Sequence, residues 1–385
     1  MSSQFSASSK SSAEVKQQNA ALIGIVGAGQ LAQMMARAGL PLGLRFVFFA
    51  EPSEDTRCVD GLGEICRIDA QASVLFERGG RPAFITVEKE HVDLGLMSEF
   101  AKCCELRPSL AALKAFKNRL VEKRKLDSLN IPLADYCEVR NREDARAAFE
   151  RFGSDGFLKS QEEGYDGYNQ WRVTPESAAS VLAEMPETGA WVFEKAIHFD
   201  CELSFIFVCA DGKVELAYDP AWNTHREGQL LSSIVPAPQV DRLIIAEALR
   251  FAEAIASDTN YTGVLSIECF LVNGQLLVNE IAPRVHNSGH WSMHGALTSQ
   301  FANHVRAVAG LPLTSVTRHQ QCAMVNLLGT EPSAGAIQSE RAFLYSYGKT
   351  QRERRKLGHI NVVCESAAER DGLVSDLLNQ IYGSC

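Results

Sequence analysis

Two glutamates occur in apolar segments, where carboxylates are rare. Glu268 lies within Leu265 to Val272, and Glu280 lies within Leu276 to Ile281. Burying a carboxylate costs free energy unless it pairs with a cation or binds a metal ion. Two such carboxylates on neighbouring strands are typical of a divalent-cation site, and their oxygen ligands favour Mg²⁺. The alternative is a pair of solvent-facing carboxylates on an edge hairpin.

The loop between these segments decides whether the two glutamates can cooperate. A two-residue loop would place Glu268 and Glu280 on opposite faces of the hairpin. A three-residue loop, 272–274, would pair Leu271 with Gln275 and bring the two carboxylates onto one face. We predict the three-residue loop, because only that register makes a metal site.

A run dense in hydrogen-bonding groups, 283–291, follows the hairpin. The guanidinium of Arg284 can hold a planar anion through two parallel hydrogen bonds. An ordinary polar surface loop is the alternative. Three histidines recur here at four-residue spacing, but Gly289 interrupts any helix and no zinc-binding H-E-x-x-H motif is present, which disfavours a zinc site.

Two further segments suit phosphate binding. Lys159 ends an apolar strand and precedes a glycine-containing loop, Gly164 to Gln170, which suits a flap that closes over a polyphosphate. A basic cluster, Lys349 to Lys356, is a second phosphate candidate. The alternatives are a hairpin loop with a surface lysine and a solvated charged loop.

A glycine-rich turn, Gly27 to Gly29, follows the first apolar strand and precedes a helical pattern. Small residues at this point let a phosphate or a ribose approach the backbone. Glu51 closes the next strand, where a dinucleotide-binding domain carries its ribose-binding acid. A dinucleotide site and the plain first turn of a doubly wound domain are both open.

The elements that must position these residues follow from hydrophobic periodicity. Alternating strands and helices predict a doubly wound parallel domain from residue 21 to about 110, and residues 114–128 predict one charged helix. Short strands and one or two helices follow, with an amphipathic helix at 240–258 before the glutamate hairpin. Residues 313–385 predict short strands and a last helix.

Composition limits the class of protein. The chain has 385 residues, 46% of them hydrophobic, which fills a large core and excludes a disordered protein. A net charge of -9 argues against a general nucleic-acid or anionic-membrane binder. Three features predict a cytoplasmic protein. The eleven cysteines are scattered, and no apolar run reaches the roughly 18–20 residues of a membrane helix. The tail at 1–20 is Ser-rich, is predicted to be disordered and lacks a secretory signal.

Taken in order, these segments resemble the N5-carboxyaminoimidazole ribonucleotide synthetase family, ATP-grasp enzymes of purine biosynthesis. The most specific stretches are LLVNEIAPRVHNSGHW (276–291) and GALTSQFANHVRAVAGLPL (295–313), supported by GAGQLAQMM (27–35) and NRLVEK (118–123). The resemblance implies a mixed α/β (α+β) fold with a doubly wound N-terminal domain at 21–112. It further implies an ATP-grasp domain at 113–312 and a small β-rich C-terminal domain at 313–385. It also implies a homodimer.

The resemblance assigns a role to each matching residue. The implied nucleotide-binding residues are Arg119, Lys159, Gly164, Tyr165, Asp166, Gly167, Tyr168, Asn169, Gln170, Glu194, Lys195, Ala196, Ile197, Glu202, His225, Asn279 and Glu280. The implied Mg²⁺ ligands are Glu268 and Glu280. Arg284, His286 and Asn287 match the catalytic pocket, and Gln30, Glu88, Glu90, Lys349 and Arg355 match contacts to the ribonucleotide. The glycine-rich turn would then face this ribonucleotide and not a dinucleotide.

The implied reaction uses ATP and bicarbonate to carboxylate 5-aminoimidazole ribonucleotide through carboxyphosphate. The flap departs from the family pattern, because Tyr168 replaces a basic residue and Asn169 replaces glycine. Lys89 and His91 replace residues of a first-domain motif. A related ATP-grasp ligase that acts on another ribonucleotide or amine, and a non-catalytic nucleotide-binding descendant, therefore remain as alternative hypotheses.

Overall fold

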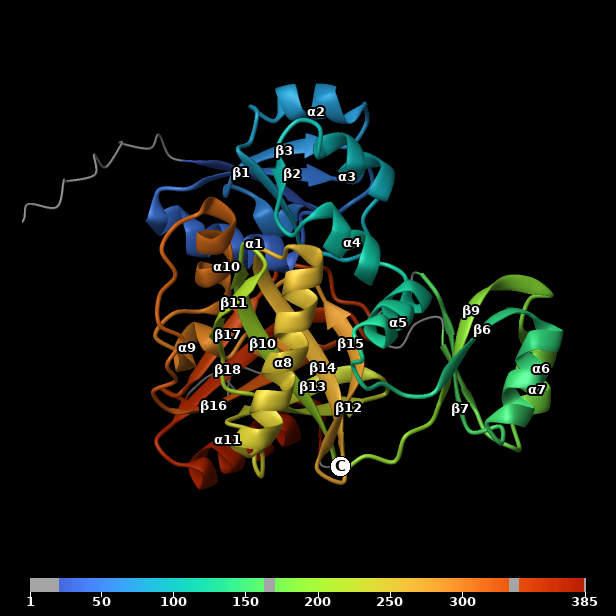
Figure 1. Ribbon diagram of the computed structural model, residues 1–385. Coiled ribbons are helices and arrows are strands. Elements are labelled where there is room, and N and C mark those ends of the chain that lie inside the picture. Colours follow the sequence, from blue (N-terminus) through green and yellow to red (C-terminus); the bar gives the residue numbers. More distant parts are fainter. Residues whose placement is uncertain (1–20, 163–169, 332–338, 384–385) are drawn as a thin grey trace, which may run out of the picture.

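The computed structural model describes residues 21–162, 170–331 and 339–383. Three sheets divide this chain (Figure 1). Along the part that is described, none of the helices has the length and the apolar character that crossing a membrane requires. The predicted tail at 1–20 lies outside the described residues.

Five parallel strands form the N-terminal sheet in the order β3-β2-β1-β4-β5. The chain builds one half of the sheet and then crosses β1 to build the other, which confirms the doubly wound prediction. The elements are β1 (Leu22–Val26), α1 (Gln30–Gly39), β2 (Arg45–Ala50), β3 (Glu64–Arg67), α2 (Ala72–Arg78), β4 (Phe84–Val87), α3 (Leu94–Phe100) and β5 (Glu105–Leu106).

Two helices, and not the single predicted one, connect this sheet to the rest of the molecule. They are α4 (Leu110–Phe116) and α5 (Arg119–Ser128). Asn118 separates them, because its side chain accepts hydrogen bonds from the first free N–H groups of α5, those of Leu120 and Val121. This N-cap fixes the start of α5 and thereby the direction of its first residues.

A four-stranded antiparallel sheet forms a small lobe that stands apart from the main body (Figure 1). Its strand order is β6-β9-β7-β8. Two helices pack on it through an apolar cluster of their own. The elements are β6 (Tyr136–Asn141), α6 (Arg142–Arg151), β7 (Gly156–Ser160), β8 (Gln170–Val173), α7 (Ala178–Glu184) and β9 (Thr188–Lys195).

The main body is a nine-stranded antiparallel sheet. Its order is β15-β14-β10-β12-β13-β16-β18-β17, and β11 also pairs with β10. The elements are β10 (Cys201–Ala210), β11 (Lys213–Ala217), β12 (Ala221–Arg226), β13 (Gln229–Val235), α8 (Arg242–Thr259), β14 (Gly263–Val272), β15 (Gln275–Ala282), α9 (Ser292–Gly295), α10 (Gln300–Ala309), β16 (Gln321–Leu328), β17 (Ala342–Ser346), β18 (Lys356–Cys364) and α11 (Ala367–Tyr382). The β-rich C-terminal segment thus continues this sheet through β16.

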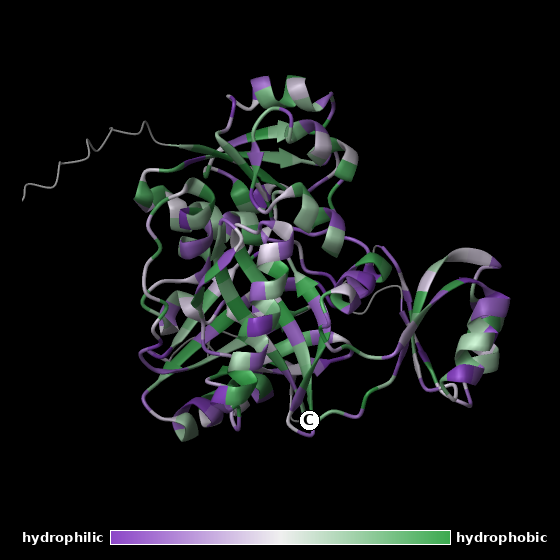
Figure 2. Cartoon of the chain, viewed as in Figure 1, coloured by the Kyte–Doolittle hydropathy of each residue, from purple (hydrophilic) through white to green (hydrophobic). Residues whose placement is uncertain are grey.

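Apolar residues concentrate along the strands of this body, as Figure 2 shows. Helix α8 covers one side through Ile244, Ala248, Phe251 and Ile255, the face that its periodicity predicts. The N-terminal unit docks on α10, where the imidazole Nε2 of His304 lies 3.0 Å from the hydroxyl of Thr86. These contacts bring the N-terminal unit against the large sheet.

Candidate active site

A cavity of about 1130 Å³ lies where the three units meet. The N-terminal unit contributes Gln30, the small lobe contributes Lys159, the large sheet contributes Glu268, and the loop after β17 contributes Lys349. Every predicted site residue that the structure describes lines this cavity except Ala196. The predicted flap residues Gly164, Tyr165, Asp166, Gly167, Tyr168 and Asn169 lie outside the described residues.

The hairpin that carries the two glutamates has a two-residue turn, so the predicted three-residue loop is wrong. Val272 pairs directly with Gln275. Asn273 and Gly274 have φ angles of 49° and 80°, both in the left-handed region. A two-residue turn with both residues in this region matches the twist of the flanking strands, and an Asn-Gly sequence suits it best.

A β-bulge then places the two glutamates opposite each other. The register shifts between Glu268 and Cys269, so that Asn279 is the additional residue on β15 and Glu268 pairs with Glu280. A bulge of this kind places two residues of one strand opposite one residue of the other and turns a side chain to the other face. The two carboxylates therefore share one face, as predicted, but a bulge and not the loop places them there, directly opposite each other and not on the diagonal.

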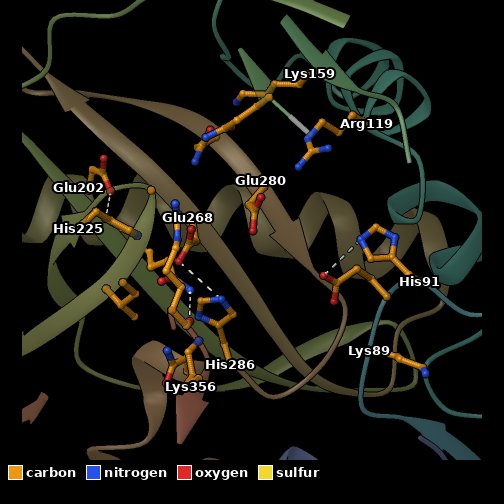
Figure 3. A pocket seen from close by; sticks show the side chains of 18 of the residues that line it. Lys89, His91, Arg119, Lys159, Glu202, His225, Glu268, Glu280, His286 and Lys356 are labelled. Carbon is orange, nitrogen blue, oxygen red and sulfur yellow. Dashed lines mark hydrogen bonds and ion pairs between the residues drawn. The ribbon is translucent and has the colours of Figure 1, made fainter. Parts of the chain in front are cut away.

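The two carboxylates and one imidazole form the metal-binding candidate of the cavity. One ligand atom from each of Glu268, Glu280 and His286 lies within 4.8 Å of the others. Figure 3 shows both glutamates between His286 on one side and the cations Lys159 and Arg119 on the other. Burial and the charge of Glu280 raise the pKa of Glu268. Such a site favours either a proton or a cation.

His286 is neutral in this environment. Burial and the nearby charge of Arg284 lower the pKa of its imidazole to about 3. Its Nε2 lies 3.6 Å from a carboxylate oxygen of Glu268, and its Nδ1 lies 2.9 Å from the hydroxyl of Ser288. The ring therefore offers a neutral hydrogen-bonding edge to a ligand in the cavity.

On the opposite wall, one buried carboxylate binds two lysines. The Glu194 Oε2 atom lies 3.0 Å from the ammonium of Lys159 and 3.3 Å from that of Lys123. Burial alone would raise the pKa of Glu194, but the two ammonium groups lower it to about 2. Arg119, also on α5, donates a hydrogen bond of 2.8 Å to the carbonyl of Ser160 in the small lobe. This wall is rich in cations.

An acid and a histidine face each other at the end of the cavity formed by β10 and β12. Glu202 and His225 form an ion pair (Figure 3). Burial lowers the pKa of His225, but the hydrogen bond to Glu202 and the neighbouring carboxylates outweigh it, so that the pKa is raised overall. Nearby, the rings of Phe199 and Phe270 stack with centroids 4.6 Å apart and line the same cavity. The apolar rings and the acid together suit a nucleoside.

The glycine-rich turn of the first domain is occupied by carboxylates of the chain itself. The N–H groups of Gly29 and Ala32 donate to Glu88 at 2.6 Å and 2.9 Å. A Cβ atom at Gly27, whose φ is +109°, would lie 2.4 Å from the Glu88 side chain. The amides that a pyrophosphate would need are thus already bonded, which argues against the dinucleotide hypothesis. Burial raises the pKa of Glu88.

The remaining predicted substrate contacts meet between the first domain and the C-terminal loop. Glu90 forms an ion pair with Arg284, and this charge overcomes burial to lower the pKa of Glu90 to about 2. The ammonium of Lys349 donates to the Gln30 side chain, and Arg355 lies 3.6 Å from Asp55. Cations from the loop after β15 and from the C-terminal loop thus face the first domain.

Asn287 is poised for a ligand. Its side chain is buried, and neither the oxygen nor the nitrogen of its amide has a hydrogen-bond partner within the described residues. Buried amides are normally satisfied, and an unsatisfied one at a cavity wall suits a polar group of a ligand.

Comparisons with known proteins agree with this geometry. Three family models match: the ribonucleotide synthetase preATP-grasp domain at 20–117, the ATP-grasp domain at 124–301 and the phosphoribosylaminoimidazole carboxylase C-terminal domain at 322–371. The N5-carboxyaminoimidazole ribonucleotide synthase of Vibrio cholerae is 39% identical over 90% of this chain and 91% of its own length.

The chain belongs to the N5-carboxyaminoimidazole ribonucleotide synthase family.

Solved structures of this family share the fold. The N5-carboxyaminoimidazole ribonucleotide synthetase of Thermus thermophilus superimposes with a TM-score of 0.85 at 35% identity, covering 94% of this chain and 99% of the other. The N5-carboxyaminoimidazole synthetase of Staphylococcus aureus, solved in complex with ADP, gives a TM-score of 0.83 at 29% identity, covering 93% and 96%.

Sequence reasoning toward this synthase family missed several residues of the site. Lys123 was visible only as one charge in a charged helix, although it belongs to the matched NRLVEK segment. The stacked pair Phe199 and Phe270 has no motif, because two isolated aromatic residues near apolar strands are more often core. Only the packing of α5 against the small lobe brings Lys123 beside Glu194, and only the pairing of Phe199 in the β9–β10 connection with Phe270 of β14 places two rings at the cavity.

Proposed function

We propose that this protein uses ATP and bicarbonate to carboxylate 5-aminoimidazole ribonucleotide, giving N5-carboxyaminoimidazole ribonucleotide in purine biosynthesis. Family membership supports the reaction, and the carboxylate pair facing a wall of cations is the structural observation that carries it. Phosphoryl transfer from a nucleotide needs these two features on either side of the phosphates.

The residues present fit Mg²⁺. Glu268 and Glu280 supply oxygen ligands, and Asn279 of the bulge lines the same cavity with a further amide oxygen. Mg²⁺ prefers oxygen to nitrogen, so that His286 lies beside the site rather than completing it. The ion would neutralise charge on the transferring phosphoryl group. Mg²⁺ dependence is thus part of the proposal.

The nucleotide would lie between the two sheets. Lys159 and Arg119 would bind its phosphates from the small-lobe side. Glu194, Lys195, Ala196 and Ile197 form the end of β9 and the connection after it, where backbone groups would meet the adenine. Glu202 would accept hydrogen bonds from the ribose hydroxyls, with His225 held beside it. Gln170, at the end of the flap, lines the same space.

Carboxyl transfer would take place between the metal site and the first domain. Attack of a bicarbonate oxygen on the γ-phosphorus would break the bond to ADP and give carboxyphosphate. The exocyclic amine of the ribonucleotide would then attack the carboxyl carbon of carboxyphosphate, or CO₂ released from it, so that an N–C bond forms, inorganic phosphate leaves and the amine loses a proton. Arg284 and the neutral His286 would hold the bicarbonate, and the unsatisfied amide of Asn287 would take a further hydrogen bond.

The ribonucleotide itself would be held at the opposite end of this space. Lys349 and Arg355 would bind its 5′-phosphate, because they supply two cations where the first domain meets the C-terminal loop. Gln30, Glu88 and Glu90 face them across the cavity. We further propose a cytoplasmic location, in keeping with the scattered cysteines, and a homodimer, in keeping with the family resemblance.

The test is phosphate release from the purified protein with Mg-ATP and bicarbonate, with and without 5-aminoimidazole ribonucleotide. Release should depend on the ribonucleotide and fall at least about 100-fold in Glu280→Ala, since a ligand of the metal is lost. Glu253→Ala, on the exposed face of α8, is the matched control. ATP binding without any effect of the ribonucleotide would reject the carboxylase in favour of another ligase or a non-catalytic protein.

A further inference from the structure

Lys123 is a buried cation that has no role in the proposed reaction as described above. Its side chain is only 3% exposed, and its ammonium lies 3.3 Å from Glu194 and over the ring of Tyr136, 5.7 Å from the centroid. It does not line the main cavity but a small adjoining chamber of about 40 Å³. Even a paired ammonium loses its hydration when it is buried, and this cost can exceed the gain from the ion pair, so the placement of Lys123 calls for a role.

Its partner, Glu194, is shared with a lysine that does face the cavity. Both ammonium groups approach the same carboxylate oxygen, at 3.0 Å from Lys159 and 3.3 Å from Lys123. The Lys159 side chain is 16% exposed, whereas those of Lys123 and Glu194 are almost fully buried. Of the two lysines, Lys159 is therefore the one positioned to leave the carboxylate for a ligand.

We propose that Lys123 is a positioning residue that keeps Glu194 neutralised, so that the ammonium of Lys159 can leave this carboxylate and bind the phosphates of the nucleotide. This inference rests on the proposed function, because that function places phosphates beside Lys159.

An unpaired buried charge is strongly destabilising, and this cost explains why Glu194 has two lysines. With Lys159 as the only directly bonded partner, each move of its ammonium to a phosphate would leave Glu194 ionised and buried, with only the more distant charge of Arg119 to stabilise it. The enzyme would then hold Lys159 on Glu194 and bind nucleotide weakly. With Lys123 in place, the carboxylate keeps one cation throughout, and Lys159 changes partner at little cost. Lys123 would then pair with Glu194, and Lys159 would pair with the phosphates of the bound nucleotide.

The local fold holds Lys123 in this position. Helix α5 begins at Arg119, next to the Asn118 cap, and Arg119 bonds the small lobe through the carbonyls of Ser160 and Gln161. Lys123 lies one helical turn after Arg119 and thus on the same face of α5. The same anchoring that brings Arg119 to the cavity brings Lys123 beneath it.

The experiment compares Lys123→Met, Glu194→Gln and the double variant in the full-length protein. Two quantities are measured: the Kd for Mg-ADP by calorimetry, and the KM for ATP against kcat in ribonucleotide-dependent phosphate release. Lys123→Met should raise the Kd and the KM about tenfold or more, with a much smaller change in kcat, because Lys159 is held on Glu194.

The double variant gives the decisive comparison. Once a neutral amide replaces the Glu194 carboxylate, no charge holds Lys159, so the double variant should bind Mg-ADP more tightly than Lys123→Met alone. Lys123→Arg should retain most of the binding, since it keeps the cation. Lys125→Met is the matched control on the same helix, because Lys125 pairs with Asp258 at the surface.

Two results would overturn the proposed role of Lys123. A purely structural Lys123 would lower the thermal stability and the active fraction but leave the Kd for Mg-ADP unchanged, and additive losses in the double variant would also overturn the proposal. The calorimetric Kd separates this inference from the reaction: a wild-type protein that binds Mg-ADP but does not respond to the ribonucleotide refutes the proposed function and leaves the role of Lys123 testable.

Discussion

Two partly buried carboxylates on one wall of the cavity and one buried carboxylate on the opposite wall differ in their electrostatics. On the large sheet, Glu268 and Glu280 stand directly opposite each other, and burial with like charge raises the pKa of Glu268. On the small lobe, Glu194 has two lysines, which outweigh burial and lower its pKa to about 2. The first group favours binding of a cation from solution, whereas the second already contains its cations.

This difference distinguishes a binding site from a supporting structure. A buried carboxylate whose pKa is raised stores unfavourable free energy that a metal ion can release on binding. A buried carboxylate whose pKa is lowered contributes stability and holds its neighbours in place. The two walls of one cavity should therefore respond in opposite directions when a glutamate is changed to glutamine.

The largest effect on folding stability is expected at Glu194. Glu194→Gln removes the charge that the buried Lys123 and the partly exposed Lys159 share, and it should lower the free energy of unfolding by about 3–5 kcal/mol at neutral pH. The stabilisation by an acid of lowered pKa is complete above its ordinary pKa of 4.5 and disappears as the pH falls toward 2. Urea unfolding of both proteins should show a difference that shrinks below about pH 4.5. A constant difference over this range would contradict the assignment.

The opposite sign is expected at the metal site. In the absence of Mg²⁺, Glu268→Gln should raise the free energy of unfolding by about 2 kcal/mol at about pH 8. A raised pKa means that the folded state holds its proton longer than the unfolded state, so that wild-type stability falls as the pH rises above 4.5. Urea unfolding at a series of pH values should therefore show that the gain vanishes near about pH 4.

Added Mg²⁺ should distinguish the metal site from the small lobe. It should stabilise the wild-type protein in thermal unfolding, and Glu268→Gln should lose most of this response. Glu194→Gln serves as the counterpart, because it leaves both metal-site carboxylates intact and should keep the response. An equal Mg²⁺ response in wild type and Glu268→Gln would place the cation elsewhere.

The smallest effect is expected at the hairpin turn. Asn273→Ala places alanine at a φ of 49° and should lower the free energy of unfolding by about 1 kcal/mol. The Mg²⁺ response should not change, because the bulge at Asn279 and not the turn sets Glu268 opposite Glu280. Loss of the Mg²⁺ response in this variant would show that the turn controls the register of the glutamates.

Local sequence determined much of this protein. The apolar runs Leu265 to Val272 and Leu276 to Ile281 predicted a strand on each side of Asn273 and Gly274, and the structure has β14 and β15 there. The periodicity of 240–258 predicted the buried face of α8. These signals are local, because hydrophobic spacing and turn residues act over a few neighbours. The motif segments likewise indicated which residues line the cavity, since they carry the family pattern in order.

Only the tertiary structure decided how the charges interact. A bulge is a response of two strands to each other, so that the direct pairing of Glu268 with Glu280 could not be derived from loop length. The sharing of Glu194 between Lys123 and Lys159 joins residues far apart in the chain, and it exists because α5 packs against the small lobe. The sequence determined which charged groups are present, and packing determined which of them are buried together. The pKa values and the roles of these groups depend on this shared burial.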